Sequence, residues 1–366
     1  MDSVRENPSI DKVWGGRMIL ISAVICTYNR SRMLVGALES LVQQSLDPHC
    51  YEIMVVDNAS TDETPEVMRA LQEKYSEHNI MYIYESRQGA GYARNIGLRH
   101  ARGRYVAYLD DDARVNPDWL KDALELLESV EPIPICVGGP ILPFYDAPKP
   151  EWFKDDYETW THGDEPRRLH REEAFAGSNM VWRKEIAESL GGFEVDLGPK
   201  GGYFSLGEDT ALFDRVWRSF DHPVFYYSPQ LSVYHWVAPL KMTVSYQLKW
   251  WFVHGQVRNQ IYGPEVFWNR LLLLVRLLWG IIKVGSLAFW RCRSYCHWEN
   301  WVVEEWGPVV RKMGILFGLL GLTIPVKLKD QGWGALQCVR KSSKDVILDT
   351  GPVNDAVSCP IYQKDS

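Results

Sequence analysis

The stretch YVAYLDDDARV, residues 105–115, carries an apolar run directly into three consecutive aspartates, Asp110, Asp111 and Asp112. Neighbouring carboxylates repel one another and raise each other's pKa. Such a run at the end of a strand therefore predicts one of two things. It is either a solvated acidic turn before a helix, where aspartate is favoured, or a site that receives a positive charge.

Strand and helix patterns alternate on both sides of this stretch. Continuous apolar runs at residues 18–26, 51–57, 80–85 and 104–110 are typical of buried parallel strands. Apolar residues at helical spacing follow each run, with Asn29 and Ser31 as candidate N-caps of the first helix. This order predicts an α/β domain in which a mixed, mostly parallel sheet of Rossmann-like type has helices on both faces.

Polar side chains stand at or just beyond the ends of three of these strands, namely Asn29, Asp57 and Asp110. Folds of this class bind ligands at the carboxyl ends of their strands. Asp110 and Asp112 project to the same side of an extended chain, so they can hold one cation between them. Hard oxygen ligands of this kind suit Mg²⁺ or Mn²⁺.

The pattern changes after Ile141. Residues 143–173 are rich in proline, aromatic and charged residues, which predicts a long irregular segment that acts as a lid or binding loop. A strand, a helix and two short strands are expected between residues 174 and 237. Nine of the sixteen tryptophans lie between Trp236 and Trp306. We therefore expect an N-terminal extension at 1–17, a main domain at 18–236, a helical region at 237–329 and a polar tail at 330–366.

Composition excludes several classes of protein. The net charge of −7 argues against a general nucleic-acid binder. Residues 1–17 are polar, so we expect no secretory signal. Seven cysteines is an odd number in a long chain, which disfavours a disulfide framework and favours a reducing compartment. Cys292, Cys296 and His297 lack a second Cys/His pair, which disfavours structural zinc.

Two other enzyme classes fit the motifs poorly. A phosphatase of the D-x-D-x-T type would use the first aspartate as its nucleophile, but position 114 is Arg rather than Thr. A dinucleotide-binding loop would need the spacing G-x-G-x-x-G, whereas the glycines here are Gly89, Gly91 and Gly97. We therefore do not expect a dehydrogenase.

Five motifs occur in a fixed order: ISAVICTYNRSRML at 21–34, EIMVVDNASTDET at 52–64, GAGYARNIGLRHARGRYVAYLDDD at 89–112, LGGF at 190–193 and GEDTALFDR at 207–215. With this order and spacing, residues 19–236 resemble the family-2 glycosyltransferases of the GT-A fold. The resemblance implies an inverting, metal-dependent enzyme of glycan or polysaccharide assembly. It would move a sugar from a nucleotide-diphosphate donor to a hydroxyl of a glycan, lipid-linked or protein acceptor, with Mg²⁺ or Mn²⁺ as cofactor.

The same resemblance implies roles for residues on the donor side. Thr27 and Tyr28 match positions that line the nucleoside pocket, and Asp57 matches the carboxylate that hydrogen-bonds the base. Arg94 matches a residue near the nucleotide. Asp57 could instead be an ordinary turn residue, and Arg94 a solvated helix residue.

The metal and acceptor sides follow in the same way. Asp110 matches the residue at the ribose and metal edge, and Asp112 the principal metal ligand. Asp111 lies between them as a further substrate-binding candidate. His235 matches a histidine that approaches the metal or the diphosphate, although a single histidine at a strand end can be purely structural. The divalent ion and the diphosphate would relieve the repulsion among the aspartates.

Asp209 matches the catalytic base, with Glu208 beside it at the acceptor side. This pair could otherwise be an acidic first turn of a helix. A non-catalytic nucleotide- or carbohydrate-binding protein on the same fold is the alternative function. The presence of Asp110, Asp112 and Asp209 favours the enzyme.

Residues 267–293 form the most apolar stretch of the chain. Asn269, Arg276 and Lys283 are spaced by seven and share one helical face, which favours a helix lying in a membrane interface. The length also allows a span, since about 20 apolar residues suffice, but each charge near the centre costs ~2.5–3.5 kcal/mol. Packing on the main domain or on a partner is the alternative. We expect a peripheral or monotopic protein on the cytoplasmic side of a membrane.

Overall fold

The computed structural model describes residues 18–171, 173–200, 202–262 and 267–327. The predicted N-terminal extension, 1–17, and the predicted polar tail, 330–366, lie outside these residues. The boundary expected near residue 237 stays a prediction.

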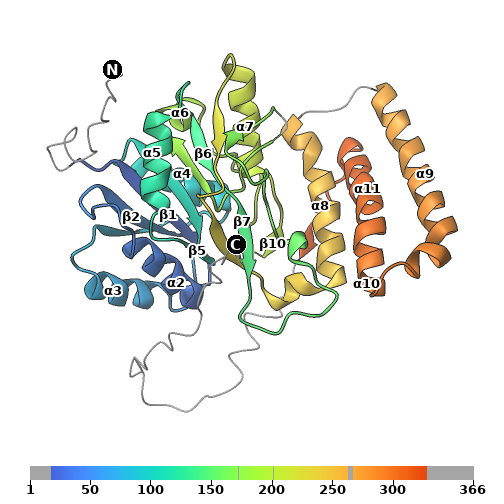
Figure 1. Ribbon diagram of the computed structural model, residues 1–366, viewed down its shortest axis with the longest axis horizontal. Helices are drawn as coiled ribbons and strands as arrows, with labels where there is room; N and C mark the ends of the chain where they lie inside the picture. Colours follow the sequence, from blue (N-terminus) through green and yellow to red (C-terminus); the bar gives the residue numbers. More distant parts are fainter. Residues whose placement is uncertain (1–17, 172, 201, 263–266, 328–366) are drawn as a thin grey trace, which may run out of the picture. The chain divides into compact units, whose positions relative to one another are not determined.

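The centre of the fold is an eight-stranded sheet in the order β3-β2-β1-β4-β9-β6-β11-β8 (Figure 1). Its first four strands are parallel and confirm the four apolar runs: β1 Ile21–Thr27, β2 Tyr51–Asp57, β3 Ile80–Tyr84 and β4 Tyr105–Asp110. The strand β9, Met180–Arg183, runs antiparallel to β4. The remaining strands are β6 Cys136–Gly138, β11 Phe225–Tyr227 and β8 Arg167–Arg168.

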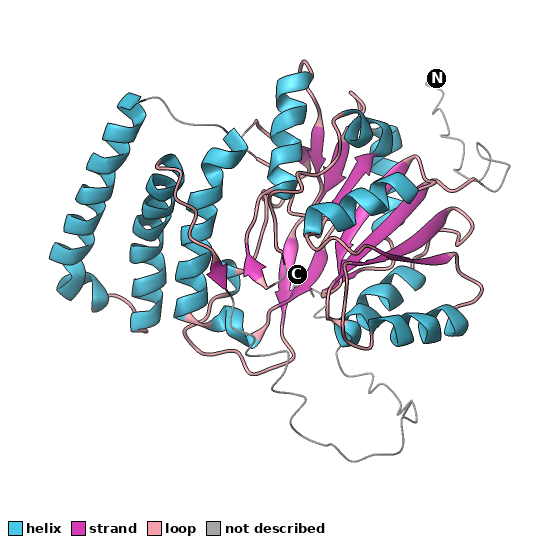
Figure 2. Cartoon of the chain, turned by 180° about the vertical axis from the view of Figure 1, so that it is seen from behind, coloured by secondary structure: helices cyan, strands magenta, loops and turns pink. Residues whose placement is uncertain are grey.

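Helices cover both faces of this sheet, as Figure 2 shows. They are α2 Ser31–Val42, α3 Thr64–Lys74, α4 Ala90–His100, α5 Trp119–Ser129, α6 Lys184–Ser189 and α7 Glu208–Ser219. Side chains of β1 alternate between two cores: Ile25 packs with α2, α3 and α5, and Val24 packs with α4, α6 and α7. The predicted α/β architecture is therefore confirmed.

The start of α2 differs from the expectation. Neither Asn29 nor Ser31 caps the helix with its side chain. Instead, the carboxylate of Asp62 accepts a hydrogen bond from the Ser31 N–H at 3.0 Å and another from the Thr64 N–H at 3.2 Å. One aspartate thus satisfies the first turns of both α2 and α3, a contact that the local sequence around Ser31 cannot indicate.

A smaller sheet stands at the carboxyl end of β4. It contains β5 Ala113–Val115, β12 Val233–Trp236 and β7 Ile141–Phe144 in the order β5-β12-β7. Because β12 runs antiparallel to β5, His235 lies opposite Ala113. The following irregular segment, as expected, contains little regular structure beyond β8 and the 3₁₀ turn η1, Asp155–Tyr157.

The helical C-terminal region is confirmed as well. Its elements are η2 Pro239–Met242, α8 Val244–Tyr262, α9 Phe267–Cys292, α10 Trp298–Trp301, the π-helical turn η3 Val302–Trp306 and α11 Gly307–Leu319. A Cβ added at Gly255 of α8 would lie 2.1 Å from the Arg311 carbonyl oxygen, and one at Gly314 of α11 would lie 2.1 Å from that of Phe252. The two glycines therefore allow the backbones of α8 and α11 to touch. After α11, β13 Val326–Lys327 pairs with β10 Tyr203–Phe204.

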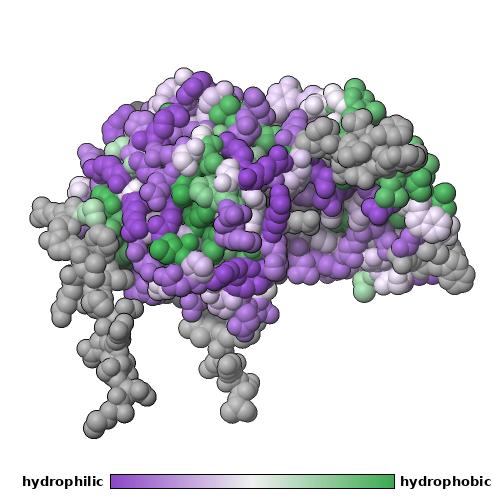
Figure 3. All heavy atoms as spheres, turned by 90° about the horizontal axis from the view of Figure 1, so that it is seen from above, coloured by the Kyte–Doolittle hydropathy of each residue, from purple (hydrophilic) through white to green (hydrophobic). Residues whose placement is uncertain are grey.

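Helix α9 has two different sides. Leu277 and Val284 are buried with Val309 of α11. Other apolar side chains of α9 are exposed, namely Leu272, Leu274, Val275, Leu278, Trp279, Ile281 and Ile282. Figure 3 shows hydrophobic side chains gathered over this helical region, at the right of the view. Among the described residues, no helix is both long enough and apolar enough to cross a membrane.

Candidate active site

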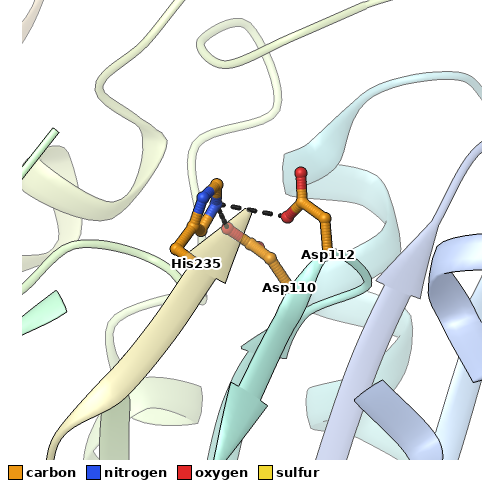
Figure 4. A group of neighbouring side chains, drawn as sticks. All are labelled: Asp110, Asp112 and His235. Carbon is orange, nitrogen blue, oxygen red and sulfur yellow. Dashed lines mark ion pairs between the residues drawn. The ribbon is translucent and has the colours of Figure 1, made fainter. Parts of the chain in front are cut away.

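Three of the predicted residues converge at the carboxyl end of β4 (Figure 4). Asp110 ends the strand, Asp112 lies in the turn to β5, and His235 approaches from β12. The Trp236 N–H donates to the Asp112 carbonyl oxygen at 2.9 Å, which fixes β12 beside this turn. His235 Nε2 lies 3.2 Å from Asp112 Oδ1 and 3.6 Å from Asp110 Oδ2.

This group has the properties of a metal site. One ligand atom from each residue lies within 4.8 Å of the others. Asp112 Oδ1 is buried and accepts no hydrogen bond from the part of the chain that the structure describes, although an unsatisfied buried acceptor is costly. Burial opposes the charged form of His235, but the carboxylates of Asp112 and Asp110 outweigh it and raise the pKa of that imidazole. The two carboxylates suit Mg²⁺ or Mn²⁺, and the imidazole adds a third ligand.

Arg30, which the sequence reasoning did not single out, lies against the other aspartate oxygens. Its Nη1 donates to Asp111 Oδ1 at 3.0 Å and to Asp112 Oδ2 at 2.7 Å. Thr27 Oγ1 donates to Asp111 Oδ2 at 2.8 Å. Part of the repulsion that a divalent ion was expected to relieve is therefore relieved by the chain itself. In the sequence, this contact is indicated only by the position of a basic residue just after β1, the strand next to β4.

Asp111 points inward rather than toward His235. Both of its oxygens accept hydrogen bonds within the chain, and its side chain is buried. Burial raises the pKa of this carboxyl to about 6; Arg30 opposes the shift and Asp112 adds to it. The contact of Asp111 with substrate is therefore still only a prediction.

Arg94 joins the candidate metal group to the start of α7. Its side chain is only 8% exposed, so the alternative of a solvated helix arginine is wrong. The guanidinium forms an ion pair with Glu208, and its Nη2 lies 3.5 Å from Asp110 Oδ1. Burial would raise the pKa of Asp110, but His235, Arg94 and Arg30 together lower it to about 2.

Glu208 and Asp209 share the first turn of α7 but have different surroundings. Glu208 is buried against Arg94, and burial raises the pKa of its carboxyl. Asp209 is half-buried, and its Oδ1 accepts a hydrogen bond from the Thr210 N–H at 2.6 Å. A Cβ added at Gly177 would lie 3.4 Å from Asp209 Oδ2 and 2.3 Å from Arg94 Nη2. Asp209 therefore lies next to the Arg94–Glu208 ion pair but remains partly exposed.

The donor-side candidates lie on neighbouring strands. Asp57 is fully buried, and its oxygens accept hydrogen bonds from the Ser60 N–H at 2.8 Å and the Tyr82 hydroxyl at 2.6 Å. Tyr28 is half-buried at the end of β1. The structure thus places Asp57 in a local network of the chain, and its contact with a base stays a prediction.

Comparison with known proteins agrees with this geometry. The family model "Glycosyl transferase family 2" matches residues 22–191. A glucosyl-dolichyl phosphate glucuronosyltransferase of Haloferax volcanii is 27% identical over 59% of this chain and 68% of its own length. A Methanococcus voltae enzyme is 28% identical over 74% of this chain and 84% of its own. It is named dolichyl N-acetyl-alpha-D-glucosaminyl phosphate 3-beta-D-2,3-diacetamido-2,3-dideoxy-beta-D-glucuronosyltransferase.

One solved structure extends the agreement to the fold. The mannosyltransferase PcManGT from Pyrobaculum calidifontis, in complex with GDP-Man and Mn²⁺, matches with a TM-score of 0.58. The match covers 82% of this chain and 88% of that protein at 19% identity, which is a likeness of fold. Residues 22–191 therefore form a glycosyl transferase family 2 domain, and the chain is a glycosyltransferase of the GT-A fold.

Proposed function

We propose that this glycosyltransferase is an inverting enzyme that moves a sugar from a nucleoside-diphosphate donor to an acceptor hydroxyl in glycan or polysaccharide assembly. One observation carries the proposal. The group of Asp110, Asp112 and His235 is connected through Arg94 to the turn that holds Asp209. A site for the diphosphate and a carboxylate for the acceptor thus lie on the two sides of one arginine.

Residues of the strand ends would bind the donor. Thr27, Tyr28 and Asp57 are the proposed nucleoside contacts, with the diphosphate next to Asp110. Asp110, Asp112 and His235 would hold Mg²⁺ or Mn²⁺, which when bound supplies positive charge to the departing diphosphate. The complex of the mannosyltransferase with Mn²⁺ supports this choice of cofactor.

Asp209 would act on the acceptor. Its carboxylate takes the proton of the acceptor hydroxyl while that oxygen forms a bond to the anomeric carbon. The bond from that carbon to the phosphate oxygen breaks in the same displacement, so the anomeric configuration inverts. A general base of this kind supplies ~10²–10⁴-fold in rate. Glu208 would support the acceptor side through its pair with Arg94.

The acceptor is proposed to be a glycan, a protein or, as the dolichyl phosphate names of two relatives favour, a lipid-linked sugar. A lipid-linked acceptor fits the exposed apolar side of α9, beside which Arg276 and Lys283 are exposed. We propose that residues 18–236 form the catalytic domain and 237–329 a helical region that touches the membrane. The protein would then be peripheral or monotopic on the cytoplasmic side.

Binding and transfer test this proposal separately. In a screen of nucleotide sugars, the correct donor should raise the melting temperature only when Mg²⁺ or Mn²⁺ is present. A ligand at 100 times its Kd adds ~2.7 kcal/mol of stability. The bound donor should then be consumed when acceptor is added. Stabilisation by a donor that is never transferred or hydrolysed would favour the non-catalytic binding protein instead.

A further inference from the structure

We infer that Arg30 and Arg94 determine which cation the site prefers. Each arginine holds one carboxylate oxygen, so that Asp110 and Asp112 offer only one oxygen each to the ion. This favours small six-coordinate ions over Ca²⁺. This inference rests on the proposed metal dependence of the enzyme. It assigns a positioning role to two residues that contact the carboxylates rather than the ion.

The two carboxylates are held in the same way. Arg30 Nη1 lies 2.7 Å from Asp112 Oδ2, and Arg94 Nη2 lies 3.5 Å from Asp110 Oδ1. The opposite oxygen of each carboxylate faces His235 Nε2, at 3.2 Å for Asp112 and 3.6 Å for Asp110. Each aspartate therefore presents one oxygen to the candidate site and keeps the other against a guanidinium.

The arginines are themselves held in place. Arg30 also bonds Asp111 Oδ1, which is buried. Arg94 is buried between Glu208 and the ring of Phe193, with its guanidinium carbon 5.7 Å from the ring centre. Neither carboxylate can turn its second oxygen into the site without breaking an ion pair in which one partner is buried, which is costly.

Divalent ions differ in what they need from such a site. Ca²⁺ takes six to eight oxygens in a flexible shell and uses carboxylates in bidentate fashion, whereas Mg²⁺ requires near-octahedral geometry and keeps several waters. Mn²⁺ likewise takes carboxylate and water ligands. Two single carboxylate oxygens suit the smaller ions, and the missing second oxygens disfavour Ca²⁺.

The charges of the site agree with one divalent ion. Asp110, Asp111 and Asp112 carry three negative charges, and Arg30 offsets one of them. Arg94 is offset by Glu208. The two negative charges that remain are balanced by a single divalent ion. The two arginines therefore account both for the net charge of the site and for the number of oxygens it offers to the ion.

The test compares two ions of equal charge, so that the lost charge of an arginine cancels. Mn²⁺ affinity of the full-length protein is measured by electron paramagnetic resonance of the free ion, and Ca²⁺ affinity by competition. Removing a group that orients a metal ligand typically changes affinity ~10–100-fold. We expect Arg30→Gln to lower the ratio of the Ca²⁺ to the Mn²⁺ dissociation constant by about tenfold. Arg30→Lys, which can place one ammonium between the same oxygens, should keep most of the ratio.

Two controls make the result specific. Arg114→Gln removes the same charge from β5, but the Arg114 guanidinium lies 4.9 Å from the Phe144 ring centre and should leave the ratio unchanged. Asp112→Asn should abolish Mn²⁺ binding and so identify the titrated site. If Arg30→Gln shifts both affinities in parallel, Arg30 acts through charge alone and the inference is wrong. A wild-type protein that binds neither ion would refute metal dependence itself, while donor binding and transfer are still measured independently.

Discussion

Asp112 is the residue on which the proposed metal site depends most, because its buried Oδ1 has no hydrogen-bond donor among the described residues. We expect Asp112→Asn to abolish sugar transfer and to weaken donor binding in Mn²⁺. The amide keeps the size of the side chain, and Arg30 keeps its contact with Asp111, so the fold should remain. Transfer assays and Mn²⁺-dependent thermal shifts measure the effect. Full activity of this variant, or of the wild type in excess chelator, would contradict the assignment.

Asp209 should behave differently, because a base contacts the acceptor rather than the nucleotide. In Asp209→Asn, donor affinity should stay near that of the wild type while turnover falls by at least ~10². Calorimetric donor titration and initial rates give the two numbers from one preparation. A loss of donor affinity in step with turnover would instead make Asp209 a donor ligand or a structural residue.

Glu208 provides the contrast, although it is the adjacent carboxylate. In Glu208→Gln the buried Arg94 loses its closest partner, and breaking one side of a buried ion pair costs about 3–5 kcal/mol. Asp209 is half-buried, so Asp209→Asn should leave the free energy of unfolding almost unchanged. Urea denaturation of both variants decides the matter. Equal stability of the two variants would mean that the Arg94 pair does not support the fold.

The elements differ in how far the sequence predicts them. The runs that became β1, β2, β3 and β4 are long and apolar, so their strand character and parallel order follow from the pattern alone. The strands β5 and β12 have three and four residues and pair across more than a hundred positions. No local pattern encodes that pairing, and His235 could therefore be placed beside the aspartates only through the family resemblance.

The same limit applies to side-chain contacts. Asp110 and Asp112 could be assigned from their spacing and strand end, since these are local properties of the chain. The contacts of Arg30 with Asp112 and of Arg94 with Glu208 join separate segments, 82 and 114 residues apart. A close approach such as that of Gly177 to Arg94 likewise exists only in the assembled fold.

Helices α8 and α11 meet around a histidine whose protonation should affect stability. His254 Nδ1 accepts a hydrogen bond from Arg311 Nε at 3.1 Å, and the ring stacks on Trp250. Burial lowers the pKa of His254 to about 4, and the positive charge of Arg311 acts in the same direction. In the unfolded chain the pKa is about 6.5. Between these values the unfolded state binds more protons, so acidification favours unfolding.

We therefore expect this contribution to be complete above pH 6.5 and to be lost as the pH falls from about 6.5 to 4, with a size of about 3 kcal/mol. Urea denaturation of the wild type and of His254→Gln at several pH values measures it. The difference in pH slope between the two proteins isolates this histidine from other acid-labile groups. His49→Gln, at an exposed loop position, is the matched control. An unchanged slope in His254→Gln would contradict the expectation.

The irregular segment, which lies within the residues that match family 2, also contacts the helical region. Lys154 Nζ lies 2.6 Å from Glu304 Oε1, and Asn300 Nδ2 donates to the Trp152 carbonyl oxygen at 2.5 Å. Phe153 is buried with Val237 and Met242 at the start of the same region. On its other side, the Tyr227 hydroxyl of β11 donates to the Gly163 carbonyl oxygen at 2.7 Å. The segment predicted as a binding loop thus packs against both the main sheet and the helical region.

The proposed membrane contact can be tested through charge. Arg276 and Lys283 are exposed on α9 beside its exposed apolar side chains. Each basic residue near an anionic surface contributes ~1 kcal/mol. Reversing both to Glu replaces attraction with repulsion, and partition into anionic liposomes should fall by more than tenfold, since ~1.4 kcal/mol is a factor of ten. Flotation of the wild type and of Arg276→Glu/Lys283→Glu at low and high salt measures the change.

The control must carry the same change of charge on another surface. Arg69 of α3 and Lys121 of α5 are exposed on the sheet-covering helices, so Arg69→Glu/Lys121→Glu should float as well as the wild type. High salt should reduce wild-type flotation, because it screens the headgroup charge. An α9 variant that floats like the wild type would point to a purely apolar anchor. A wild-type protein that stays soluble without lipid and never floats would mean that a second protein surface, rather than a membrane, covers α9.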